Sequence, residues 1–99
     1  MGERESWSGV RARRMSEPGA AEKYKATRLA FELGSAVREL RVARGWSQTQ
    51  LASAAGMTQP AVARFEAGGT VPTFPVLGRI ARALDADLTI RVAPRSGVA

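Results

Sequence analysis

Capping and helix-ending residues stand at short intervals through the middle of the chain, and they limit the helices there to a few turns each. Gly45 suits the left-handed end of one helix, and Ser47 with Gln50 forms the capping-box pattern that starts the next. This second helix is predicted to run through Ala55 and to end at Gly56.

A third helix is predicted directly after that turn. Thr58 or Gln59 caps it, and Pro60 fits its first turn, where the backbone N–H groups have no acceptor within the helix. The helix is expected to stop at Gly68 and Gly69.

Apolar residues at helical spacing flank this segment on both sides. Before it, steps of three and four residues predict one helix that ends at Arg44, although Gly34 leaves open two helices that meet there. After it, a fourth helix is predicted to start at residues 73–75. The two apolar stripes are Ala26, Leu29, Ala30, Leu33, Val37 and Leu40 in the first helix, and Leu77, Ile80, Ala81 and Leu84 in the last.

The C-terminal part, residues 85–99, holds an alternating pattern instead. Leu88, Ile90 and Val92 alternate with polar residues across 87–93, which is typical of a strand with one buried face. A lone strand cannot satisfy its own backbone groups, so this segment is expected either to pair with another molecule or to stay irregular. The predicted fold class is all-α, apart from this one strand.

Composition restricts the chemistry of the chain. Its 99 residues suit one small domain, and they include no cysteine and no histidine. We therefore expect no enzyme, no cofactor and no metal site. Fifteen Lys and Arg against nine Asp and Glu give a net charge of +6, which favours a polyanionic partner, either nucleic acid or an anionic membrane surface. Without a bilayer-length apolar stretch or a secretory signal, a cytoplasmic protein with no membrane contact is expected.

The residues outside the predicted helical domain, 18–84, leave alternatives open. Residues 1–17 have few large apolar side chains and predict a flexible N-terminal arm. Its arginines at positions 11, 13 and 14 fit either a solvated tail or an arm that enters a DNA minor groove. Trp7, Tyr24 and Phe31 are candidate contacts to a protein partner, although Tyr24 and Phe31 also fit a longer first helix packed on the bundle.

The second and third helices together, residues 48–67, have the spacing of a helix-turn-helix, whose second helix fits the DNA major groove. With Ala52, Val62 and Phe65 pointing inward, the outer face consists of Gln59, Pro60, Ala63 and Arg64. A glutamine pairs with adenine and an arginine with guanine, while small residues allow contact with a thymine methyl. Gln48 is placed to reach a phosphate or an edge base.

From Val37 to Leu84 the sequence resembles the lambda-repressor-like, or xenobiotic-response-element, helix-turn-helix family. The resemblance rests on the patterns SQxxLAxxxG, (I/V)xRxExGxxxP and LxxIAxxL, formed by Ser47, Gln48, Leu51, Ala52, Gly56, Val62, Arg64, Glu66, Gly68, Pro72, Leu77, Ile80, Ala81 and Leu84. It implies a bundle of four or five helices and binding of a palindromic double-stranded DNA operator by a dimer.

The same resemblance implies roles for individual residues. It places Thr58, Gln59, Pro60 and Arg64 at base-reading positions, gives Gln48 a phosphate or base contact, and lays the Gly69–Thr73 loop, with Thr70, along the DNA backbone. It also implies an internal ion pair between Arg41 and Glu66.

Residues 85–92 resemble the C-terminal strand of the HigA-like and HipB-like antitoxin branch, in which two such strands pair across a dimer. The resemblance thus implies a homodimer in which Leu88, Ile90 and Val92 form the dimerisation strand. The resulting expectation is a repressor that acts as the antitoxin of a toxin–antitoxin pair and regulates its own operon, with the toxin protein as partner. The alternatives are a stand-alone transcriptional regulator of the same family and a protein-interaction module that reads no DNA. Pro60 and Ala63 occupy positions of the outer face where many relatives of the family carry polar side chains. With fewer hydrogen bonds to bases available, we expect the affinity for DNA to depend more on phosphate contacts or on DNA shape.

Overall fold

The computed structural model describes residues 19–95, and this part of the chain holds four helices and no strand. They are α2 (Ala20–Ala43), α3 (Gln48–Ala55), α4 (Gln59–Glu66) and α5 (Phe74–Ala83). The all-α prediction is therefore confirmed. The predicted arm at residues 1–17, with Trp7, lies outside the described residues.

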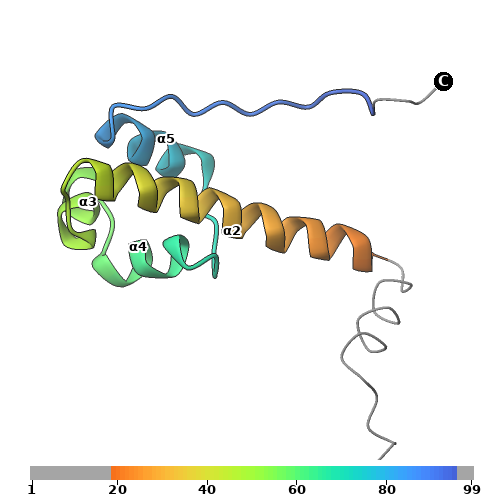
Figure 1. The fold of residues 1–99 in the computed structure, drawn as a ribbon, viewed down its shortest axis with the longest axis horizontal. Helices are drawn as coiled ribbons and strands as arrows, with labels where there is room; N and C mark the ends of the chain where they lie inside the picture. Colours follow the sequence, from red (N-terminus) through yellow and green to blue (C-terminus); the bar gives the residue numbers. More distant parts are fainter. Residues whose placement is uncertain (1–18, 96–99) are drawn as a thin grey trace, which may run out of the picture.

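The helices form a small bundle at one end of α2. α3 packs on both α4 and α5, and α2 packs on α4. Figure 1 shows the C-terminal half of α2 against the three short helices, while its N-terminal half extends beyond them. The side chains buried most completely are Leu51, Val62, Phe65 and Ile80.

α2 starts earlier than the apolar stripe from Ala26 predicts, and it is not divided at Gly34. It begins at Ala20 and continues through Gly34 to Ala43. The glycine is needed for packing, because a Cβ atom at this position would overlap the carbonyl oxygen of Phe65 in α4. α2 and α4 thus approach each other more closely than any other residue type would allow.

The buried side of α2 differs from the predicted stripe. Ala30, Gly34, Val37 and Arg41 are buried, and Leu33 is partly so, whereas Leu29 and Leu40 of the predicted stripe are 65% and 44% exposed. The difference arises because α2 turns its small residues towards α4. In α5 the prediction is confirmed for Leu77 and Ile80, which are buried, as is Leu84 directly after the helix.

The predicted C-terminal strand at residues 87–93 is not present. After Leu84 the chain continues without regular structure to residue 95, and Figure 1 shows it as an extended segment that runs in the direction opposite to α2. A strand requires the backbone of a neighbouring strand as its partner, and the described residues of one chain provide none.

Candidate nucleic-acid interface

Caps set both ends of α3 and the start of α4. Ser47 Oγ accepts a hydrogen bond from the Gln50 N–H at 3.1 Å, and the Ser47 N–H donates to Gln50 Oε1 at 2.7 Å. Gly56 takes the left-handed conformation, with φ 69°, that closes α3. Thr58 Oγ1 then accepts from the Ala61 N–H at 3.2 Å, which identifies Thr58 as the cap of α4.

One face of α4 is buried and the other is open to solvent. Val62 and Phe65 are 0% and 1% exposed, so they fix the rotation of the helix against the core. The remaining residues considered from the sequence lie on the outer side: Gln59, Pro60 and Arg64 are exposed, and Ala63 is partly exposed. Thr70 is also exposed, in the loop that follows α4.

Gln48 and Gln59 are joined across the two helices. The side-chain amide of Gln59 donates from Nε2 to Gln48 Oε1 at 2.9 Å, and Gln48 Nε2 donates to Glu66 Oε1 at 3.1 Å. Each amide group has two N–H donors and one oxygen acceptor. These contacts therefore leave the oxygen and one N–H of Gln59 available, together with the second N–H of Gln48.

Glu66 is held in turn by Arg41, as the resemblance implied. Arg41 Nε donates to Glu66 Oε2 at 2.7 Å and Nη2 donates to Oε1 at 2.9 Å, while Nη1 donates to the Trp46 carbonyl oxygen at 2.7 Å. The side chains of Arg41 and Glu66 are 11% and 2% exposed. The hydrogen bond to Glu66 raises the pKa of Arg41 above its ordinary value, against the opposing effect of burial, so the guanidinium remains charged.

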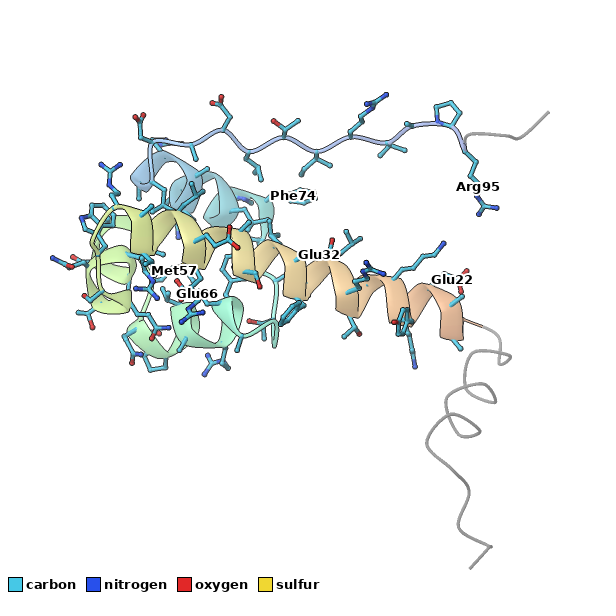
Figure 2. All side chains as sticks on the ribbon, in the orientation of Figure 1. Glu22, Glu32, Met57, Glu66, Phe74 and Arg95 are labelled. Carbon is cyan, nitrogen blue, oxygen red and sulfur yellow. The ribbon has the colours of Figure 1, made fainter. Side chains whose placement is uncertain are left out.

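The result is a chain of polar contacts from the interior to the surface. It begins at Arg41 in α2, passes through Glu66 at the end of α4 and Gln48 at the start of α3, and ends at Gln59 at the start of α4. Figure 2 shows Glu66 on the side of α4 that faces α2. The links of Gln48 could not be predicted from the sequence, because its two partners lie 11 and 18 residues away and no spacing rule connects them.

The other predicted site residues lie away from this face. Leu88, Ile90 and Val92 are in the extended C-terminal segment and are 39%, 59% and 96% exposed. Tyr24 and Phe31 belong to α2, so the longer first helix is confirmed. The backbone and side chain of Phe31 lie against Gly68, in the turn after α4.

Two short helices that meet at a capped glycine turn, with the second presenting polar residues to solvent, define a helix-turn-helix protein. The sequence pattern of the family described as Helix-turn-helix domain matches residues 32–92, more than half of the chain, and the chain belongs to that family. Membership indicates DNA binding and transcriptional regulation, and such domains are typically not enzymes. The comparisons with curated proteins and with solved structures found no match.

Within residues 19–95 no helix is both long and apolar enough to cross a bilayer. The same residues contain no cluster of acidic side chains suited to holding a metal ion.

Proposed function

We propose that this protein is a sequence-specific transcriptional repressor that binds a palindromic DNA operator as a homodimer. The observation that carries the proposal is the contact chain from Arg41 to Gln59, because it fixes two amide groups at the exposed starts of α3 and α4. A base-reading side chain loses less conformational entropy on binding when it is already held in position.

The contacts available on this face match the groups of the DNA major groove. The free oxygen and N–H of Gln59 suit the N6 and N7 atoms of adenine, and Arg64 suits the O6 and N7 atoms of guanine. Gln48 directs its remaining N–H to a phosphate, where the N-terminus of α3 adds a favourable dipole. Thr58, Pro60, Ala63 and Thr70 complete the contact surface along the base edges and the backbone.

Charge supports a polyanionic partner. The chain carries a net charge of +6, so nucleic acid binding releases counterions and weakens as the salt concentration rises. A protein-interaction module that reads no DNA would not show this salt-dependent binding of nucleic acid.

The proposal is tested by selecting duplexes from a random pool with the full chain and measuring the affinity of the selected sequence by fluorescence anisotropy. We expect a palindromic site with half-sites about one DNA turn apart. We also expect the affinity to fall steeply between about 50 mM and 200 mM salt. Enrichment of no sequence, with equal affinity for selected and scrambled duplexes, would contradict the proposal and favour a protein-interaction module.

The C-terminal segment is the proposed dimerisation element. Leu88, Ile90 and Val92 are exposed in the single chain, and antiparallel pairing with the same segment of a second copy would give their backbone groups partners. Such a pair fixes the distance between two recognition helices, which a palindrome requires.

A finer proposal is that the repressor is the antitoxin of a toxin–antitoxin pair. It is supported by the resemblance of residues 85–92 and by the exposed aromatic side chains of Tyr24 and Phe31, at 41% and 59%, on α2. Co-expression with the protein encoded beside its gene and purification of the complex test it. A tight complex that binds the promoter of both genes supports an antitoxin, whereas DNA binding without a protein partner identifies a stand-alone regulator.

A further inference from the structure

α2 carries a second apolar row that is separate from its buried side. The row consists of Ala26, Leu29, Leu33, Ala36, Leu40 and Ala43, here called the α2 row. Its steps of three and four residues alternate without interruption, which is the heptad spacing of a helix that packs along another helix. At about 100° per residue these side chains share one face, next to the face of Ala30, Gly34 and Val37 that packs in the bundle.

The α2 row is mostly uncovered in the single chain. Leu29 and Leu40 are 65% and 44% exposed, and only Leu33 of this row is partly buried against the core. The row also begins before the helix-turn-helix domain, since the family match starts at residue 32. A continuous exposed apolar row of this length is expected to be covered by a partner surface.

The charges beside the α2 row suit an antiparallel copy of the same helix. Along the flank away from the bundle, Lys25 and Arg28 come first and Glu32 and Glu39 follow. An antiparallel neighbour of identical sequence places Lys25 of each helix opposite Glu39 of the other. Glu32 then lies near the centre, where Arg28 of its own helix compensates its charge through an ion pair of 3.0 Å.

The direction of the C-terminal segment agrees with this arrangement. In Figure 1 this segment runs opposite to α2, along a line roughly parallel to the axis of that helix. A twofold axis perpendicular to this common direction makes the two α2 helices of a dimer antiparallel to each other. The same axis makes the two C-terminal segments antiparallel as well.

We propose that the α2 row is an interface filled by the α2 row of a second copy of this chain, packed antiparallel. This inference deepens the dimer of the proposed function and rests on it, because it adds a helix pair to the pairing of the C-terminal segments. Leu29 and Leu33 form the centre of the contact, and Ala26 and Ala36 allow the two helices to approach closely.

The first experiment compares Leu29→Glu with Val42→Glu by analytical ultracentrifugation of the full chain. Val42 is 57% exposed and lies on the opposite side of α2, which makes it a matched control. Because each substitution occurs twice in a dimer, Leu29→Glu should raise the dimer dissociation constant about 100-fold. Val42→Glu should leave it unchanged. Far-UV circular dichroism confirms that both variants keep their helices.

The second experiment tests the direction of packing with exchanged charges. Lys25→Glu and Glu39→Lys should each raise the dissociation constant about 3- to 10-fold, and the double variant should restore the original value. A wild-type chain that stays monomeric, a Leu29→Glu variant that dimerises normally, or a double variant without rescue would overturn the inference.

DNA binding separates this inference from the proposed function. Binding of a single operator half-site should be equal in the wild type and in Leu29→Glu, because the α2 row lies away from α4. If half-site binding is present and dimerisation ignores Leu29, the interface is wrong and the function stands. If dimerisation depends on Leu29 and no DNA is bound, the function is wrong and the interface stands.

Discussion

Replacing Glu66 with alanine should destabilise the domain by about 3–5 kcal/mol, because it leaves a buried charge without its partner. The Glu66 side chain is 2% exposed and accepts two hydrogen bonds from Arg41 and one from Gln48. Without Glu66, the Arg41 guanidinium keeps one acceptor among the described residues, the Trp46 carbonyl oxygen. A small domain has a free energy of unfolding of only about 5–15 kcal/mol, so the loss is a large part of the total.

Urea unfolding followed by circular dichroism measures this effect. With a slope of about 1–3 kcal/mol/M, the midpoint should fall by about 2 M. The control is Glu32→Ala, which breaks the exposed pair with Arg28, where the side chains are 69% and 55% exposed, and which should cost less than about 1 kcal/mol. Equal unfolding midpoints for the two variants would refute the claim that the buried pair joins α2 to α4.

Four other substitutions test the packing of α2, the base readout and the dimer interface. Gly34→Ala should destabilise the domain by about 1–3 kcal/mol, because the added Cβ atom overlaps α4. Gly78→Ala, which has open space around it, should stabilise the domain by about 0.5–1 kcal/mol. Denaturant midpoints that move in the same direction for both variants would exclude the close approach of α2 and α4. Arg64→Ala should lose about 1–3 kcal/mol of discrimination at one operator position in a competition assay, and an unchanged base preference would remove Arg64 from the readout. Ile90→Asp should weaken binding of the whole operator at least about tenfold more than binding of a half-site, and an unchanged dimer dissociation constant, measured by light scattering over a concentration series, would remove the C-terminal segment from the interface.

The helices α3 and α4 were predictable because their ends are set by local chemistry. Ser47, Gly56 and Thr58 act on backbone groups within four residues of themselves, so their effect can be recognised in the sequence alone. The burial of Leu77 and Ile80 followed from spacing in the same way.

The first helix and the polar contacts were harder to predict, since they depend on packing between distant segments. The spacing of Leu29 and Leu40 is that of a buried stripe, yet α2 turns Ala30 and Gly34 inward because only small residues fit against α4. Likewise, no local pattern indicates that Gln48 joins Glu66 to a residue in the next helix. The predicted strand failed in the single chain because pairing is a property of two backbones.

The central claim is that Gln59, held through Gln48, reads a base in the major groove. The most direct measurement is a double-mutant cycle of four affinities. The wild type and Gln59→Ala are each measured on the selected operator and on the same duplex with one adenine of the half-site replaced. The cycle is repeated for each adenine in turn. The account predicts that for one adenine the wild type loses about 1–3 kcal/mol on base replacement and the variant loses almost nothing, so the two changes are coupled. Additive losses at every adenine would contradict it, because they would show that Gln59 contributes to binding without reading any of these bases.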